Sequence, residues 1–174
     1  MKLTKEYIKD NYLILIIKIS IICLFIFSLI YGVSGTINHF NSVRDYTTNG
    51  FNKYFQIATN NYYLRPTSIL LIPTIGTFIN KKIGWILIQS YFYFLISNLV
   101  FPAIEIGLID STLVFINVIG FIFLLLIIIL MNKMKISNHN YGIEKKELIN
   151  KNIIASVIGI SITIILAMIK GNEV

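Results

Sequence analysis

Charged residues are scarce in this sequence of 174 residues. Only 13% of them are Asp, Glu, Lys or Arg, whereas a soluble domain carries about 25%. Hydrophobic residues make up 56%, and the mean hydropathy is +0.76. So little polar surface cannot cover a globule in water, which excludes an ordinary soluble domain. The composition therefore predicts an integral membrane protein.

The sequence also lacks the residue sets that metal and catalytic sites use. Its one cysteine, Cys23, excludes an internal disulfide and a thiolate metal cage. His39 and His139 fall on opposite sides of the membrane in the predicted topology, so they cannot share a metal ion. There is no H-E-x-x-H motif, no Gly-rich phosphate loop, no G-x-S-x-G motif and no carboxylate pair within an apolar run. We therefore expect no cofactor, no metal and no enzymatic activity.

Long apolar runs are what the sequence does contain. A membrane-crossing helix needs roughly 20 apolar residues to cross about 30 Å of hydrocarbon. Four runs meet this length or come close to it: 12–33, 83–103, 112–131 and 153–169. Residues 62–79 form a weaker candidate, because Pro73 and Gly76 interrupt a short apolar run. By length alone, this segment could instead be re-entrant.

The distribution of Lys and Arg decides between four spans and five. With five spans and the N terminus inside, ten of the 15 basic residues lie inside, four lie outside, and Lys18 lies within the first span. If residues 62–79 do not cross, Lys81, Lys82 and the lysines of 132–151 all move outside. Cytoplasmic loops of membrane proteins are enriched in Lys and Arg. This rule favours five spans.

The predicted fold is thus an all-α, polytopic membrane bundle that forms one domain over residues 1–174. It has five transmembrane helices, or four if 62–79 is re-entrant, with an outer segment at 34–61 and an inner loop at 132–151. Trp85 is expected at the membrane interface, where indoles prefer to lie. The abundance of Ile, Asn and Lys follows AT-rich codons, which favours a bacterial source. We therefore expect a multi-pass protein of a bacterial cytoplasmic (inner) membrane.

Four polar residues within the predicted spans are candidate functional residues: Lys18, Gln89, Asn98 and Asn117. Lys18 lies about 9 Å past Tyr12 at the rise of a helix, so its ammonium group can snorkel to the cytoplasmic headgroups. An ion path or a partner contact is the alternative. The amides are expected to form hydrogen bonds between helices, with Asn98 and Asn117 as a candidate pair.

Two surfaces are candidates for contact with other helices or proteins. The last span carries small residues at i+4 spacing, which allow close helix packing: Ala155, Gly159, Thr163 and Ala167. The outer segment carries an aromatic interaction surface: Phe40, Phe51, Tyr54 and Phe55. The last three share the spacing of one helix face, which suits a membrane surface or a partner.

Three classes of function are compatible with these features. The first is a non-catalytic membrane interaction protein, either an accessory subunit of a membrane complex or an immunity-type membrane protein. The second is an oligomeric channel-like or membrane-disrupting effector. The third is a small carrier, although five spans give no inverted-repeat pairing. The expected partners are membrane lipid and either another protein or a second copy of this chain. Nucleic acid is not expected, because the basic residues cluster beside apolar runs.

Overall fold

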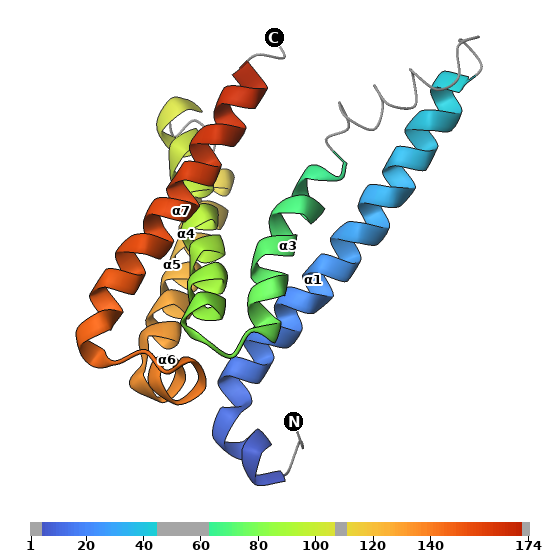
Figure 1. The fold of residues 1–174 in the computed structure, drawn as a ribbon. Coiled ribbons are helices and arrows are strands. Elements are labelled where there is room, and N and C mark those ends of the chain that lie inside the picture. Colours follow the sequence, from blue (N-terminus) through green and yellow to red (C-terminus); the bar gives the residue numbers. More distant parts are fainter. Residues whose placement is uncertain (1–4, 45–62, 107–110, 172–174) are drawn as a thin grey trace.

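The computed structural model describes residues 5–44, 63–106 and 111–171. This part of the chain forms six helices and no strand, which confirms the predicted all-α fold (Figure 1). The helices are α1 (Lys5–Arg44), α3 (Arg65–Phe78), α4 (Lys82–Ile106), α5 (Ser111–Asn132), α6 (Met134–Tyr141) and α7 (Lys145–Gly171).

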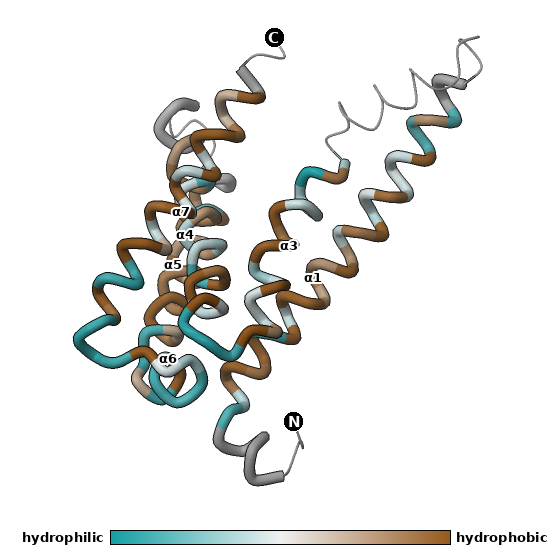
Figure 2. Tube along the Cα trace, in the orientation of Figure 1, coloured by the Kyte–Doolittle hydropathy of each residue, from teal (hydrophilic) through white to brown (hydrophobic). Residues whose placement is uncertain are grey.

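Helices α1, α4, α5 and α7 are long and apolar enough to cross a membrane, as expected for a membrane protein. Figure 2 shows apolar residues along these helices and polar residues around the turn from α3 to α4, in α6 and at the start of α7. Helix α3 has 14 residues, which gives about 21 Å at the helical rise. By length, therefore, four helices qualify as spans, one fewer than predicted.

Helix α4 is the centre of the bundle and contacts α3, α5, α6 and α7. Helix α1 packs chiefly along α3. Helices α1, α4 and α7 run in one direction, while α3 and α5 run in the other (Figure 1). The beginning of α1 and the end of α7 therefore lie at opposite ends of the bundle.

The core surrounds α4, where the side chains of Trp85 and Ile88 are fully buried. Helix α4 is the most buried of the four long helices, whereas α1, α5 and α7 each expose most of their apolar residues. A helix with outward apolar side chains is stable only where lipid or another apolar surface covers it. The membrane, or a neighbouring protein within it, must therefore cover these three helices.

One end of the bundle is rich in lysine, and we name it the basic end. The beginning of α1, the turn from α3 to α4, α6 and the first turn of α7 all lie there (Figure 1). The lysines of the turn, of α6 and its start, and of the start of α7 are Lys81, Lys82, Lys133, Lys135, Lys145 and Lys146.

The side chain of Trp85, three residues after Lys82, points into the bundle; its expected level at the membrane interface stays a prediction. Its indole is fully buried, and Nε1 donates a hydrogen bond to the backbone oxygen of Met131 at 3.0 Å. Met131 lies in the last turn of α5, where the carbonyl groups have no partner within the helix. The indole therefore satisfies the end of α5 instead of facing lipid headgroups.

Helix α6 ends in an αL cap that turns the chain into α7. Gly142 has φ 67°, a left-handed conformation that favours glycine. Its N–H donates to the oxygen of Asn138 at 2.8 Å, and the N–H of Ile143 donates to the oxygen of Ser137 at 3.0 Å. Ile143 is thereby fully buried. Helix α7 begins at Lys145, so the last long helix starts within the predicted inner loop.

Helices α4 and α7 approach most closely at Gly159. A Cβ atom at Gly159 would lie 2.5 Å from the backbone oxygen of Ser90 and 2.7 Å from the backbone nitrogen of Phe94. One turn later, the Thr163 hydroxyl lies 3.4 Å from the oxygen of Gly159 and 3.5 Å from the oxygen of Phe94, and it shares its hydrogen between them. Small residues thus bring the two backbones together, which is the packing predicted for them.

The contact is shorter than the predicted face of four residues. Ala155 is fully buried, and Gly159 and Thr163 are buried as well, but Ala167 is exposed. Asn98, one turn after Phe94 on α4, is also exposed. Along this face, the contact between α4 and α7 therefore ends within one turn after Thr163.

We predict that Gly159→Ala destabilises the protein. The new methyl group would meet backbone atoms, which cannot move aside as a flexible side chain can, so we expect a loss of about 1–3 kcal/mol. The matched control is Gly120→Ala in α5, where a Cβ would lie 3.6 Å from Cδ1 of Leu99. Melting in detergent should show a lower midpoint for Gly159→Ala alone; equal midpoints for both variants would contradict the close contact.

Candidate functional site

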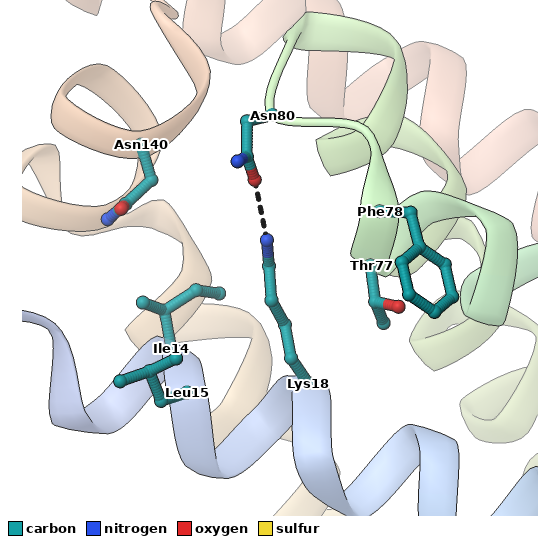
Figure 3. A pocket seen from close by; sticks show the side chains of 7 residues that line it. All are labelled: Ile14, Leu15, Lys18, Thr77, Phe78, Asn80 and Asn140. Atoms are coloured by element: carbon teal, nitrogen blue, oxygen red, sulfur yellow. Dashed lines mark hydrogen bonds between the residues drawn. The ribbon is translucent and has the colours of Figure 1, made fainter. Parts of the chain in front are cut away.

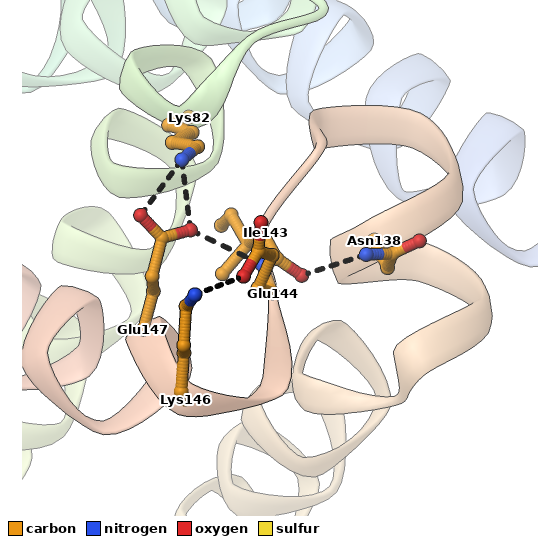
Figure 4. A network of polar contacts seen from close by, with 6 residues as sticks. All are labelled: Lys82, Asn138, Ile143, Glu144, Lys146 and Glu147. Carbon is orange, nitrogen blue, oxygen red and sulfur yellow. Dashed lines mark hydrogen bonds and ion pairs between the residues drawn. The ribbon is translucent and has the colours of Figure 1, made fainter.

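At the basic end, Glu147 joins the beginnings of α4 and α7. Both of its carboxylate oxygens accept hydrogen bonds from Nζ of Lys82, each at 2.8 Å (Figure 4). Oε2 also accepts from the backbone N–H of Glu144 at 3.2 Å, which caps α7 as the third helical residue of a capping box does. Lys146 pairs with Glu144 at 2.9 Å.

The ion pair between Lys82 and Glu147 positions the helices more than it stabilises them. The two side chains are 42% and 30% exposed, and a pair with such access to solvent contributes little to stability. Its geometry nevertheless places the first turns of the parallel helices α4 and α7 at the same level. The close contact at Gly159 then follows from this register.

Further into the bundle, the side-chain amide of Asn152 connects three helices. Its Oδ1 accepts hydrogen bonds from Nε2 of Gln89 at 3.3 Å and from the hydroxyl of Tyr93 at 2.9 Å. Its Nδ2 donates to Oδ1 of Asn132 at 2.7 Å and to the oxygen of Leu148 at 3.1 Å. Asn152 thus joins α4, α5 and α7.

The ammonium group of Lys18 points toward the basic end and contacts two other residues there. Its Nζ donates to Oδ1 of Asn80 at 2.7 Å, in the turn between α3 and α4 (Figure 3). The ammonium group also lies 5.5 Å from the ring centroid of Tyr141 in α6, within the range of a cation–π contact. The side chain therefore points in the direction expected for a snorkelling lysine, but it links α1 to two other elements of the fold.

A pocket of about 310 Å³ surrounds this lysine. Three elements line it besides α1: the end of α3, the turn that follows, and α6. Figure 3 shows the lysine side chain rising between two apolar walls, with amide side chains near its tip. The lining residues are Ile14, Leu15, Lys18, Thr77, Phe78, Asn80 and Asn140. The pocket combines one cation and two amides with an apolar rim.

The other predicted intramembrane polar residues have different surroundings. Gln89 is fully buried and bonds Asn152, as described above. Asn98 is exposed, and Asn117 is partly buried. Within 63–106 and 111–171, no hydrogen bond joins Asn98 to Asn117, so the structure does not form the candidate pair.

The predicted outer surface is described only in part. Phe40 lies near the end of α1 and is partly buried. Phe51, Tyr54 and Phe55 lie outside the described residues.

No grouping typical of a metal site occurs among the residues that the structure describes: no three His, Cys, Asp or Glu side chains come together there. Comparison with protein-family models, with curated proteins and with solved structures found no match to this chain. Its function must therefore be inferred from its own geometry.

We predict that Asn152→Ala destabilises the bundle. The substitution leaves the partner groups on α4 and α5 without their hydrogen bonds, and an unsatisfied buried polar group costs about 1–3 kcal/mol. Asn150→Ala is the matched control, because Asn150 is exposed on the same helix. The melting midpoint in detergent should fall for Asn152→Ala and stay unchanged for Asn150→Ala. An equal effect at both positions would mean that helix propensity, not the amide network, governs the result.

Proposed function

We propose that this chain crosses the membrane five times and acts, without catalysis, by contact with another membrane protein. It would serve as an accessory subunit of a membrane complex or as an immunity-type membrane protein. Its basic end would face the cytoplasm, since cytoplasmic segments are enriched in lysine. The proposed location is a bacterial cytoplasmic membrane.

The position of α3 along α1 supports the fifth crossing. At one end, a Cβ atom at Gly35 would lie 2.8 Å from the ring of Tyr63, just before α3. At the other end, Asn80 accepts the hydrogen bond of Lys18. The stretch of α1 from Lys18 to Gly35 measures about 26 Å at the helical rise, close to the roughly 30 Å of the hydrocarbon core. The segment from Tyr63 to Asn80 runs beside this whole stretch of α1. It is therefore long enough to cross the membrane, although its helical part is short.

Hydrogen bonds within α3 also suit a membrane environment. The hydroxyl of Thr74 donates to the oxygen of Leu70 at 2.7 Å, and that of Thr77 donates to the oxygen of Thr74 at 2.7 Å. Since hydrocarbon offers no hydrogen-bond partners, hydroxyl groups must be satisfied within the protein, as these two are.

The length of α1 is the main observation that supports a role in binding another protein. Its 40 residues extend about 60 Å. Even at a tilt of about 40°, roughly 26 residues suffice to cross 30 Å of hydrocarbon. Counted from Asn11, such a crossing ends at Thr36. Residues 37–44 therefore extend beyond the membrane core as an arm of α1, at the end of the bundle opposite the basic end.

The arm carries an exposed apolar side chain among polar neighbours. Ile37 is 53% exposed, and the side chains of Asn38 and Asn41 are exposed beside it. An apolar side chain with a polar surround resembles the centre and rim of a protein interface. The arm therefore supports contact with a second protein outside the membrane core.

A second candidate function, an oligomeric channel-like effector, rests on Asn98. This amide is exposed on a long apolar helix, and a polar group facing lipid is unfavourable unless it meets another polar group. A second copy of the chain could supply that group next to the exposed Ala167. Crosslinking distinguishes this alternative from a different partner by the mass of the product.

We predict that a photo-crosslinking amino acid at Ile37 captures a distinct protein in intact cells. The matched control is the same amino acid at Phe27, which is 71% exposed within the apolar part of α1 and should meet lipid. A discrete product at Ile37, absent at Phe27 and containing a second polypeptide, is the expected result. A product made of two copies of this 19.9 kDa chain would favour the channel-like alternative. No protein product at Ile37 would contradict contact with a second protein through the arm.

A further inference from the structure

Among the side chains that the structure describes, no carboxylate pairs with Lys18. An ammonium group has three hydrogen-bond donors; within this part of the chain Asn80 accepts from one of them at 2.7 Å, and the ring of Tyr141 adds a cation–π contact at 5.5 Å. Asn80 is neutral and cannot balance the charge. None of the residues that line the pocket is acidic, and neither ion pair of Lys82 or Lys146 involves Lys18. The pocket therefore suits a ligand with a negative charge and acceptor oxygens.

The walls indicate that this ligand also has an apolar part. Ile14 and Leu15 line one side, and Phe78 lines the other (Figure 3). Phe78 is 74% exposed, so its ring extends from the pocket along the outside of the bundle. A small soluble anion would leave this apolar rim unused. An acyl chain that descends from a bound headgroup would cover it.

The location of the pocket agrees with a lipid ligand. Lys18 lies near the start of the apolar run of α1, and its ammonium reaches Asn80 at the basic end. An ammonium group that snorkels from this part of an apolar helix reaches the headgroup phosphates of one leaflet. Basic pockets between helices on the cytoplasmic side commonly hold anionic lipid headgroups. A volume of about 310 Å³ accommodates a headgroup, while the acyl chains remain in the bilayer.

We propose that this pocket binds the headgroup phosphate of an anionic phospholipid between α1, the turn from α3 to α4, and α6. The two remaining donors of the Lys18 ammonium bind phosphate oxygens. The amide of Asn140 in α6 lines the pocket across from Asn80. A choline or ethanolamine headgroup binds less well, because it brings a cation to a lining that has no carboxylate to receive it. The bound lipid joins α1 and α6, which have few direct contacts of their own.

Native mass spectrometry of the full chain in detergent tests this site. The probes are phosphatidylglycerol and phosphatidylcholine with identical acyl chains. The unmodified protein should retain more phosphatidylglycerol than phosphatidylcholine. In Lys18→Gln the apparent affinity for phosphatidylglycerol should fall about fivefold, since one lysine near the membrane surface contributes about 1 kcal/mol to anionic lipid binding. Lys18→Arg should keep the preference, because it keeps the charge.

Two further variants keep the test decisive. Lys145→Gln removes an exposed lysine of the basic end that does not line the pocket, and it should leave lipid retention unchanged. Asn140→Ala changes the part of the pocket lining that α6 contributes and leaves α1 unchanged. It should weaken retention of phosphatidylglycerol even if Lys18→Gln fails to fold.

Three results would overturn the proposal. The first is equal retention of the two lipids by the unmodified protein. The second is an equal loss of phosphatidylglycerol in Lys18→Gln and Lys145→Gln, which would indicate a diffuse attraction to the basic end. The third is complete displacement of phosphatidylglycerol by millimolar inorganic phosphate, which would identify a site for a soluble anion.

Discussion

The architecture depends on one constraint: lysine side chains must reach water, while the apolar runs between them must stay out of it. The lysines of the turn from α3 to α4, of α6 and of the start of α7 all gather at the basic end (Figure 1). A chain that returns to the same end after each pair of helices must have α1, α4 and α7 parallel. Short helix α3 makes this possible, because without it α4 would start at the opposite end.

Polar contacts then align the parallel helices. Glu147 caps α7 and binds Lys82 at the start of α4, and Asn152 joins the same two helices to α5 one turn and a half further on. Above this level the packing depends on small residues such as Gly159. Each polar contact is modest, since hydrogen bonds between membrane helices average about 0.6 kcal/mol. Together they select one register among the many that apolar surfaces alone would allow.

Much of the fold could be predicted because apolar run length and lysine position are local properties of a sequence. Helices α4 and α5 lie close to the predicted runs 83–103 and 112–131, whereas α1 and α7 extend well beyond 12–33 and 153–169. Small residues at i+4 spacing indicated where α7 approaches α4. The predicted contact extended one turn too far, to Ala167, because spacing along one helix does not show where its neighbour turns away. Helix α3 was ambiguous for a similar reason: its position beside α1 depends on Tyr63 and Asn80, which lie outside its helix.

The side-chain partners were not predictable, since they depend on distances between segments far apart in the sequence. Lys18 and Asn80 are 62 positions apart, and nothing in either neighbourhood identifies the other. Trp85 has the residue type of an interfacial anchor, yet the end of α5 provides a carbonyl that holds it in the core. Asn152 lies at the boundary of an apolar run, where an amide is usually solvated. One local signal was available: acidic residues are favoured at the start of a helix, and Glu144 and Glu147 precede the last apolar run.

Thiol accessibility in intact cells tests the five-pass arrangement most directly. In a Cys23→Ser background, His139→Cys places a thiol at an exposed position of α6, and Asn172→Cys places one just after the end of α7. Five passes with the basic end inside predict that a membrane-impermeant reagent labels Asn172→Cys at once and labels His139→Cys only after the cells are permeabilised. If α3 does not cross, both positions change sides. Labelling of His139→Cys in intact cells, with Asn172→Cys protected, would contradict the account.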